Sequence, residues 1–368
     1  MIRVLHIVGT LDAGGFETLI MNIYRKIDTA QVQFDFVVHR DMVGMYEEEI
    51  AERGGKIYHI PFLDNKNYAE YKKQLTKVIK DGDYRIVHGH HSTLGPLYLK
   101  IAKKAGVPVR IAHSHTGFHI KSVTGYAKHI ISRRYKTHAT HLFACSQVAG
   151  RYMFGKNSKF RVVNNGIDTN KFRFQPAFRE EQRKKLGIEN DFVVCHVGRF
   201  DTVKNHTYIV DVFKELVALH PQSKLMLIGI GPLEDPIRNK VNELGMSDKV
   251  LFMGQIPDVH RMLSAADAFL FPSLYEGLPL TLVEAQTAGL PVICSDTITE
   301  ECHLTQEYDI LSLEQPVQEW ARAVLKAKEA DIPREERYLL LKEKGYDSGD
   351  VANGLIGFYK EMDAKVRS

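Results

Sequence analysis

Short apolar segments alternate with amphipathic segments along the whole chain, and this alternation constrains the fold more than any other feature. The apolar segments of the first half are IRVLHIV, FDFVV, KIYHI, RIVH, VRIAH and HLFAC, and the second half restarts with FVVCHVG, KLMLIG, VLFMG, AFLFPS and PVICS. Such alternation is typical of βαβ units, in which helices connect the strands of a parallel sheet. The sequence therefore predicts an α/β protein with two Rossmann-like halves.

The length of 368 residues suits two domains of ordinary size. We predict an N-terminal domain over residues 1–168, a C-terminal domain over 169–345 and a closing helical segment over 346–368. The polar, charged stretch from Asp168 to Asp191 shows little periodicity, so we interpret it as the connector between the domains. A final helix is expected from about Val351 to Met362, after the break at Gly345.

The sequence carries features of a cytoplasmic protein. No apolar run approaches the roughly 20 residues that span a bilayer, and the apolar N-terminal stretch is too short for a signal peptide and lacks a cleavage-site pattern. The four cysteines, Cys145, Cys195, Cys294 and Cys302, form no CxxC pair. We expect them to be reduced thiols of the core.

The net charge of +4 hides a strong asymmetry. No Asp or Glu occurs from Tyr84 to Ile167, a span that holds fourteen Lys or Arg residues and nine histidines. This block is either a solvated basic face or a surface that attracts an anionic partner, such as a phosphate-bearing acceptor or an anionic membrane. Nucleic acid is not expected, because no nucleic-acid-binding motif accompanies the charge. The segment from Lys121 to Lys136 is either a membrane-facing helix or an ordinary surface helix.

The segment FPSLYEGLPLTLVEAQTAGLPVICS carries the strongest functional signal. Pro279 suits the first turn of a helix, which leaves the amides of Leu280 and Thr281 free to bind a diphosphate at the positive helix end. Glu284, one turn into that helix, would accept two hydrogen bonds from a ribose diol. Glu276, in the loop ahead, would face a sugar hydroxyl pair. The alternative is two surface glutamates that flank a helix start.

A second candidate group consists of Gly198, Arg199 and Lys204, which follow the first apolar segment of the second half. A glycine at the end of a strand lets the backbone approach a ligand. Two cations beside it would neutralise a departing diphosphate. The alternative is that both cations face solvent.

Together with GRFDTVKN and the Gly14-Gly15 loop, the spacing of Glu276 and Glu284 resembles glycosyltransferase family 4 over nearly the whole chain. The resemblance extends to bacterial enzymes that build capsular or exopolysaccharide repeat units on a lipid carrier. It implies the GT-B fold, with two Rossmann-like domains whose parallel sheets face each other across a cleft. It also implies that the C-terminal half binds the nucleotide sugar and that the last helix crosses back onto the first domain.

The same resemblance assigns roles to individual residues. It implies that Arg199 and Lys204 hold the diphosphate, Glu284 the ribose and Glu276 the donor sugar. The implied catalytic residues are His115, Arg199, Lys204 and Glu276, and the implied donor-binding residues are Gly14, Gly15, Glu17, Thr116, Gly198, Gly254, Ile256, Gly277, Leu280, Thr281 and Glu284. His90 and His91 are the candidates on the acceptor side.

We considered two metal sites and expect neither. The histidines at positions 88–91 and 113–115 are close enough in sequence to converge, but the acid-free half offers no Cys or carboxylate to complete a ligand shell. Asp81-Gly82-Asp83 spells a DxD motif, yet it lies between an expected helix and an expected strand, where Asp-Gly favours a turn. We therefore expect no structural metal and no obligatory cofactor, with the nucleotide sugar as co-substrate.

These observations predict a retaining glycosyltransferase of the hexosyltransferase type. It would move a sugar from a nucleotide diphosphate-sugar, with UDP as the expected carrier, to a hydroxyl of a lipid-linked saccharide in bacterial surface polysaccharide synthesis. Retention is implied by the resemblance alone; since no carboxylate is placed for a covalent intermediate, we favour attack by the acceptor on the face that the diphosphate leaves. The expected location is the cytoplasm, peripheral to the inner face of the cell membrane.

Three other functions remain open. A nucleotide-sugar epimerase shares the two-domain architecture, although the acid-free half lacks the carboxylates that it needs. A nicotinamide-dependent dehydrogenase requires GxGxxG, which neither GTLDAGG nor GRFDTVK provides. A non-catalytic carbohydrate-binding protein would not need Arg199 and Lys204 beside Glu284. After Glu284 the chain departs from the glycine-rich segment of the family and reads DTITEECHLTQEYDILSL.

Overall fold

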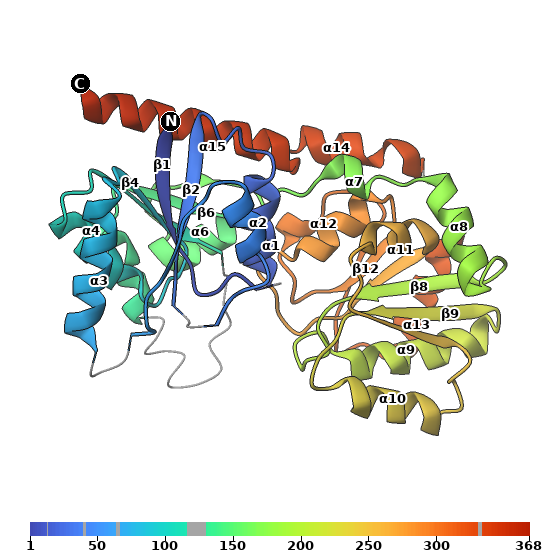
Figure 1. Ribbon diagram of the computed structural model, residues 1–368. Helices are drawn as coiled ribbons and strands as arrows, with labels where there is room; N and C mark the ends of the chain where they lie inside the picture. The colour runs from blue at the N-terminus through green and yellow to red at the C-terminus, as the bar shows by residue number, and fades with distance from the viewer. Residues whose placement is uncertain (13, 40–41, 64–66, 116–129, 330–332) are drawn as a thin grey trace. The chain divides into compact units, whose positions relative to one another are not determined.

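The computed structural model describes residues 1–368 except 13, 40–41, 64–66, 116–129 and 330–332 (Figure 1). The chain forms two compact units. Unit 1 comprises Met1–Gly166 together with Ser348–Ser368, and unit 2 comprises Ile167–Asp347. The first unit is therefore built from two separate stretches of the sequence.

Unit 1 is built on a seven-stranded sheet in the order β3-β2-β1-β4-β5-β6-β7, with every neighbouring pair parallel. Its strands are β1 (Ile2–Ile7), β2 (Val32–Val38), β3 (Ile57–His59), β4 (Ile86–Gly89), β5 (Val109–Ser114), β6 (His141–Ala144) and β7 (Arg161–Val162). The predicted parallel sheet is confirmed, and among the described strands the sequence missed only the two-residue β7. The break in strand order at β1 brings the carboxyl ends of β1 and β4 side by side.

The helices of unit 1 cover both faces of this sheet. They are α1 (Gly15–Tyr24), α2 (Glu47–Glu52), α3 (Tyr68–Asp81), α4 (Gly95–Lys104), α6 (Gln147–Phe154), α15 (Ser348–Arg367) and the 3₁₀ helix η1 (Arg133–His138). Alternate side chains of a strand point to opposite faces, so Leu5 and Ile7 join the core formed with α3, α4 and α6. His6 points to the other face, where α15 packs on α1 and β1.

Helix α15 follows unit 2 in the sequence and packs against unit 1. The hydroxyl of Tyr359 lies 2.6 Å from Nδ1 of His88 on β4, and Arg85 forms an ion pair of 2.8 Å with Asp363. Tyr359 is fully buried. The carboxylate of Asp363 thus reaches the basic span of unit 1, which has no acidic residue of its own.

Unit 2 is built on a six-stranded parallel sheet in the order β10-β9-β8-β11-β12-β13. Its strands are β8 (Phe192–Val197), β9 (Ser223–Ile228), β10 (Val250–Gly254), β11 (Ala268–Phe271), β12 (Val292–Ser295) and β13 (Tyr308–Leu311). The first five coincide with the predicted apolar segments. The sequence missed β13, an edge strand of mixed polarity.

The helices of unit 2 are α7 (Thr169–Phe172), α8 (Pro176–Leu186), α9 (His206–Leu219), α10 (Glu234–Glu243), α11 (Val259–Ala265), α12 (Leu280–Thr287), α13 (Val317–Lys326), α14 (Arg337–Glu343) and the short 3₁₀ helices η2 (Glu300–Cys302), η3 (Ala327–Glu329) and η4 (Arg334–Glu336). The core on one face of the sheet joins α9, α10 and α13, with Trp320 fully buried. Helix α12 lies directly after the loop that follows β11, so its N-terminus stands at the carboxyl edge of the sheet.

The prediction that residues Asp168 to Asp191 form a connector between the domains is wrong. These residues belong to unit 2, where they form α7 and α8, and α8 packs on α11. Helix α8 buries Gln182 and Arg183 rather than an apolar stripe. Guanidinium groups hold it in place, since Arg183 donates to the carbonyl of Ala265 at 2.9 Å. Apolar periodicity cannot reveal a helix that is anchored in this way.

No helix in the described part of the chain has the length and apolarity needed to cross a membrane. The four cysteines are all buried, as expected for Cys145, Cys195 and Cys294 from their positions in or beside apolar segments. Asp81 ends α3 and Asp83 adopts a left-handed backbone with φ 46°, so the DxD sequence forms a turn before β4.

Candidate active site

Two loops meet at the carboxyl edge of the sheet in unit 2. One follows β8 and the other follows β11, and these two strands are parallel neighbours. The amide of Leu274 donates to the carbonyl of Val203 at 2.8 Å, and the side-chain amide of Asn205 donates to the carbonyl of Pro272 at 3.1 Å. The two sequence groups proposed above, which are some seventy residues apart in the chain, thus share one site.

Lys204 and Glu276 form an ion pair in this site. Nζ of Lys204 lies 2.6 Å from Oε1 of Glu276, and their side chains are 15% and 20% exposed. The ammonium group also stands 4.7 Å from the centre of the Phe271 ring, close enough for a cation–π contact. The Asp201 carboxylate fixes the turn by accepting from the amides of Val203 and Lys204 at 3.0 and 3.2 Å.

Gly198 leaves room for the Lys204 side chain. A Cβ atom at this position would lie 2.8 Å from Nε2 of His196 and 3.0 Å from Cδ of Lys204. Gly229, at the end of β9, has φ +140° and packs its α-carbon against the carbonyl of Gly198. Only glycine fits there, because any side chain would meet backbone.

Arg199 is exposed, and among the described residues it has no ion-pair partner. It follows Gly198 directly, in the same loop as Lys204. The loop therefore carries one cation that is already paired with a carboxylate and one that is not. Two adjacent cations with hydrogen-bond donors are the means by which proteins neutralise a leaving diphosphate.

Helix α12 is present where the sequence predicts it and begins at Leu280, with Pro279 at its N-cap, directly ahead of the first turn. The first amides of a helix have no partner within it, and the positive end of the dipole favours an anion. Gly277 leads into this turn, and the buried hydroxyl of Thr281 has no hydrogen-bond partner in the described part of the chain. The helix start thus offers donors beside the Lys204–Glu276 pair.

Glu284 lies one turn into α12 and is 8% exposed. Burial raises the pKa of its carboxyl group to about 7, an effect that the positive charge of Lys171 partly opposes. A buried carboxyl group near neutrality can accept hydrogen bonds from a diol once it ionises. This is the position that the sequence assigns to a ribose.

Gly254 and Ile256 occupy the neighbouring strand end. Gly254 closes β10 with φ +65°, and its carbonyl accepts from the amide of Gly229 at 2.9 Å. Ile256 is partly exposed in the loop that follows. The ends of β8, β9 and β10 are therefore packed together through glycines.

In unit 1 the Gly14-Gly15 loop opens α1, with Gly14 at its N-cap. The carboxylate of Glu17 folds back against Gly14 and accepts from the Thr10 hydroxyl at 3.2 Å. A carboxylate at a helix N-terminus is stabilised by the helix dipole. Glu17 thus lies beside the Gly14-Gly15 loop, to which the family resemblance assigns a phosphate contact.

A chain of three histidines lies at the carboxyl ends of β1, β4 and β5. Nδ1 of His6 is 2.9 Å from Nε2 of His90, and Nδ1 of His90 is 2.9 Å from Nε2 of His115. The rings of His6 and His90 are nearly coplanar, with planes 11° apart and centres 5.2 Å apart. This is the geometry of an in-line hydrogen bond between two imidazoles.

A second chain runs beside the first. Nε2 of His88 is 3.1 Å from Nδ1 of His113, with ring planes 14° apart, and Tyr359 of α15 closes the chain at Nδ1 of His88. The sequence did not predict that His6 and Tyr359 belong to these histidine chains, because His6 joins through the strand register and Tyr359 through the packing of α15. Register alone places His6 opposite His88.

Burial lowers the pKa of His6 and of His115 to about 3, so both imidazoles are neutral at physiological pH. Burial, followed by the neighbouring histidines, lowers the pKa of His88, His90 and His113 as well. Two triads could offer ligand atoms to one metal ion, His6-His88-His90 and His90-His113-His115, since the atoms of each lie within 4.8 Å of one another. Within these triads, hydrogen bonds join His6 to His90 and His90 to His115, whereas Nε2 of His6, Nε2 of His113 and Nδ1 of His115 are buried without a hydrogen-bond partner among the described residues.

His91, the other acceptor-side candidate, is partly exposed and stands apart from both chains, with its Nδ1 accepting from the amide of Leu94 at 3.3 Å. Thr116 lies outside the described residues, as does most of the Lys121–Lys136 segment. The part of that segment that is described ends in η1, where Arg133, Arg134 and Lys136 are exposed.

Two family profiles together match nearly the whole chain. One, described as glycosyl transferases group 1, matches residues 178–346, and the other, described as Glycosyltransferase Family 4, matches residues 13–171. The Bacillus subtilis (strain 168) protein EpsF is 35% identical over 97% of this chain and 96% of its own length. An Escherichia coli protein named UDP-Gal:alpha-D-GlcNAc-diphosphoundecaprenol alpha-1,3-galactosyltransferase is 31% identical over 64% of each chain.

The fold also matches solved structures. A crystal structure of Anabaena Alr3699/HepE in complex with UDP superimposes with a TM-score of 0.82, at 15% identity, and the match covers 98% of this chain and 100% of that one. A sucrose-phosphate synthase from Thermosynechococcus elongatus superimposes with a TM-score of 0.79, at 16% identity, over 99% and 100% of the two chains. At these identities the likeness concerns the fold.

Proposed function

The chain belongs to the group 1 and family 4 glycosyltransferases, enzymes of the GT-B type, and from this premise we propose that it transfers a sugar from a UDP-sugar to a hydroxyl of a lipid-linked saccharide with retention of configuration. The observation that carries the proposal is the site in unit 2. There the Lys204–Glu276 pair and Arg199, which has no ion-pair partner among the described residues, lie in the loops that follow β8 and β11, and Glu284 lies one turn into α12. In this proposal these residues bind the sugar diphosphate and its ribose.

The choice of UDP rests on two relatives. HepE has been crystallised with UDP and with UDP-glucose, and the Escherichia coli relative is named for UDP-Gal. In this proposal Glu284 accepts from the ribose diol, and the loop at Gly254 and Ile256 holds the base. The amides of Leu280 and Thr281, together with Gly277, bind the diphosphate. Arg199 and Lys204 neutralise it.

The transfer follows from these positions. The bond between the anomeric carbon and the diphosphate oxygen breaks, and Arg199 and Lys204 stabilise the charge that develops on the leaving group. The acceptor hydroxyl forms its new bond on the face that the diphosphate leaves, and its proton passes to the departing phosphate oxygen. Glu276 orients the donor sugar, His115 makes a further contact to it, and His90 and His91 face the acceptor. No metal ion is assigned a step.

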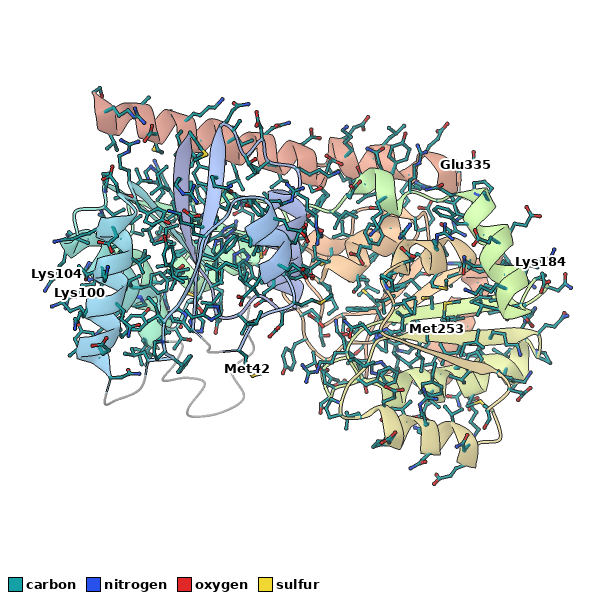
Figure 2. All side chains as sticks on the ribbon, viewed as in Figure 1. Met42, Lys100, Lys104, Lys184, Met253 and Glu335 are labelled. Atoms are coloured by element: carbon teal, nitrogen blue, oxygen red, sulfur yellow. The ribbon has the colours of Figure 1, made fainter. Side chains whose placement is uncertain are left out.

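The lipid-linked acceptor is supported by the name of the Escherichia coli relative and by a basic surface on unit 1. Lys100, Lys103 and Lys104 are exposed on α4, which packs on η1, and Lys100 and Lys104 point away from the unit (Figure 2). Exposed Ile130 and Ile131 precede the arginines of η1. We place this surface against the anionic inner leaflet, where each cation adds about 1 kcal/mol of attraction.

A thermal-shift screen against UDP, GDP, ADP, NAD and UDP-sugars tests the donor. A ligand at 100 times its dissociation constant adds about 2.7 kcal/mol to the free energy of unfolding. We expect a shift of a few degrees with UDP and UDP-sugars, lost in Glu284→Ala and retained in Glu243→Ala, which removes an exposed carboxylate of α10. A shift with NAD alone, or with no nucleotide, would refute the proposal.

Sedimentation with lipid vesicles tests the membrane surface. We expect binding to vesicles that contain anionic lipid, weakened by salt and by the double variant Lys100→Glu/Lys104→Glu. Lys184→Glu is the control, because Lys184 is exposed on α8 of unit 2 (Figure 2). Vesicle binding that does not change with salt or with anionic lipid would contradict the proposed membrane surface.

A further inference from the structure

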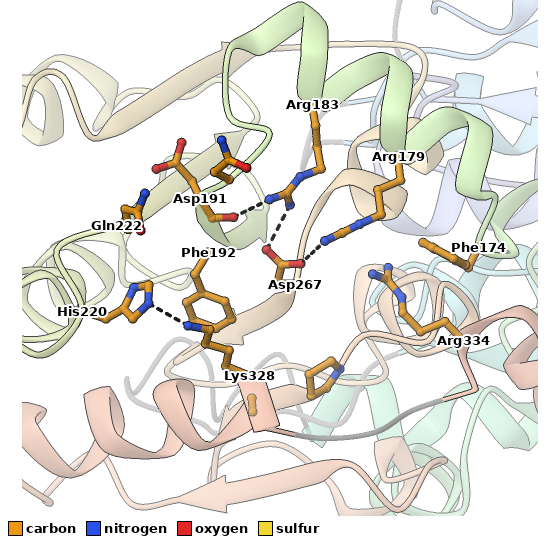
Figure 3. Close-up of a pocket in the computed structure, with 13 residues that line it drawn as sticks. Phe174, Arg179, Arg183, Asp191, Phe192, His220, Gln222, Asp267, Lys328 and Arg334 are labelled. Atoms are coloured by element: carbon orange, nitrogen blue, oxygen red, sulfur yellow. Dashed lines mark hydrogen bonds and ion pairs between the residues drawn. The ribbon is translucent and has the colours of Figure 1, made fainter.

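A cavity of about 440 Å³ opens at the amino edge of the sheet in unit 2 (Figure 3). Its lining includes Phe192 at the start of β8, with Gln222, Asp267 and Pro291 directly ahead of β9, β11 and β12. The candidate active site lies at the carboxyl ends of these strands. The cavity is therefore separated from it by the length of the sheet, roughly 20 Å for a six-residue strand.

Cationic side chains outnumber carboxylates in this cavity. Four of them line it, against Asp191 and Asp267. The cations are Arg179, Arg183, Lys328 and Arg334. Arg179 and Arg183 share a single carboxylate, since they lie 2.5 and 3.1 Å from the two oxygens of Asp267. In Figure 3 both guanidinium groups converge on that residue.

Arg334 has no carboxylate partner among the described residues. Its three nitrogens donate to the carbonyls of Leu263, Ala266 and Ala288 at 3.0, 2.9 and 3.0 Å, at the ends of α11 and α12. A guanidinium has five N–H groups, so two N–H groups of Arg334 remain to donate to a ligand. Burial lowers the pKa of Arg334 to about 9, and the charges of Arg179 and Arg183 act in the same direction. The positive charge here is only partly compensated by helix ends.

The rim and walls of the cavity suit a phosphate-bearing ligand. Lys328 is exposed, and its ammonium group donates to Nε2 of His220 at 2.8 Å. Phe174 stacks under the Arg334 guanidinium, 4.1 Å from its ring centre, which holds the plane of that group in place. Arginines fixed in this manner bind phosphate oxygens through pairs of hydrogen bonds.

We propose that this cavity is a second anion site, which binds a phosphate-bearing small molecule between Lys328 and the arginines. It does not depend on the donor assignment, because it uses other residues at the opposite edge of the sheet. The arginines also cap α11 and α12, so a purely structural role is the competing explanation. Lys328 has no part in that capping and therefore separates the two explanations.

The test is calorimetric titration of the whole protein with pyrophosphate at constant ionic strength. We expect two sites in the native protein. Lys204→Ala should remove the site at the carboxyl edge and leave the other. Lys328→Glu should weaken the second site at least tenfold and leave UDP binding unchanged. Lys326→Glu is the matched control, since it makes the same charge change on an exposed neighbour that does not line the cavity.

Three results would overturn the proposal. One is a single pyrophosphate site that Lys204→Ala abolishes and Lys328→Glu leaves intact. Another is that Lys328→Glu and Lys326→Glu weaken pyrophosphate binding equally, because the effect would then come from the net charge of the protein rather than from a specific contact. The third is no pyrophosphate site that survives in Lys204→Ala. If the native protein does not bind UDP, only the donor assignment is contradicted. The effect of Lys328→Glu on pyrophosphate binding would still test the second site.

Discussion

The ammonium group of Lys204 lies 2.6 Å from the carboxylate of Glu276, so the cation assigned to the diphosphate and the carboxylate assigned to the sugar are partners before any donor binds. Both side chains are largely shielded from solvent. A donor must therefore take Lys204 from Glu276 or bind both at once. The ion pair couples recognition of the sugar to recognition of the leaving group.

Replacing Glu276 with Gln should release Lys204. We expect Glu276→Gln to bind free UDP several-fold more tightly, because the ammonium group no longer has a competing carboxylate. Sugar transfer should fall by two or more orders of magnitude, as when other charged transition-state contacts are lost. Calorimetry with UDP and initial rates with a UDP-sugar measure the two effects. Weaker UDP binding in this variant would contradict the coupling.

Lys204→Ala should lower kcat by about a hundredfold to a thousandfold, the range found when one preorganised transition-state contact is removed. The melting temperature should change little, since the Glu276 left behind is partly exposed. Lys214→Ala, an exposed lysine of α9, is the control. Turnover close to that of Lys214→Ala would show that Lys204 does not stabilise the transition state.

Donor binding should depend on pH through Glu284. Because burial raises the pKa of its carboxyl group to about 7, this group binds a proton in the free protein below that pH. A ribose diol needs the ionised form, so affinity should rise with pH and each bound donor should release protons near neutrality. The gain is at most tenfold per pH unit. UDP-glucose suits the calorimetric measurement because its phosphates carry no group that titrates in this range.

Glu284→Gln should abolish this pH dependence and bind the donor more weakly at about pH 8. A native profile as flat as that of the variant would show that Glu284 is not the ribose ligand.

Acid should destabilise unit 1 through its histidine chains. Free imidazole has an ordinary pKa near 6.5, whereas that of His6 and His115 is about 3 in the folded protein. The unfolded state therefore binds more protons between these values, and stability is lost as pH falls below about 6.5. Each such histidine contributes up to about 1.4 kcal/mol per pH unit.

Hydrogen exchange of peptides from β1, β4 and β5 measures this loss. Strand β9 of unit 2 is the reference, since its neighbour β8 carries a single buried histidine with a lowered pKa, His196. His6→Phe should reduce the slope, since it removes one depressed group and keeps an aromatic ring against Phe34. Equal pH dependence in the two sheets would argue against a special role of the histidines.

Gly198→Ala should impair the donor site without any change of charge. The new methyl group would press on Nε2 of His196 and on the Lys204 side chain. We expect weaker UDP binding and a lower kcat. Gly357→Ala in α15 is a matched control, because its added Cβ meets nothing within 4 Å, and it should raise stability by up to about 1 kcal/mol. A UDP affinity unchanged by Gly198→Ala would mean that Lys204 tolerates displacement.

The strands were predictable because apolar runs of β-branched residues in both sheets report burial on two faces. Helix α12 was predictable from Pro279. Helix α8 was not, since Arg179 and Arg183 anchor it by donating to carbonyls. The donor residues of unit 2 could be named from spacing, but the Lys204–Glu276 pair depends on which strands are neighbours. The histidine chains depend on register, and Tyr359 joins them from the far end of the sequence.

The docking of α15 has a consequence for the order of assembly. Tyr359 and Asp363 contribute to unit 1, yet they leave the ribosome only after all of unit 2 has been translated. Until then the Tyr359 side of His88 is uncovered, together with the face of β1 on which α15 packs. The first unit to be synthesised is thus the last to be completed. Unit 2, a continuous segment, can fold while the sheet of unit 1 still lacks the helix that covers one of its faces.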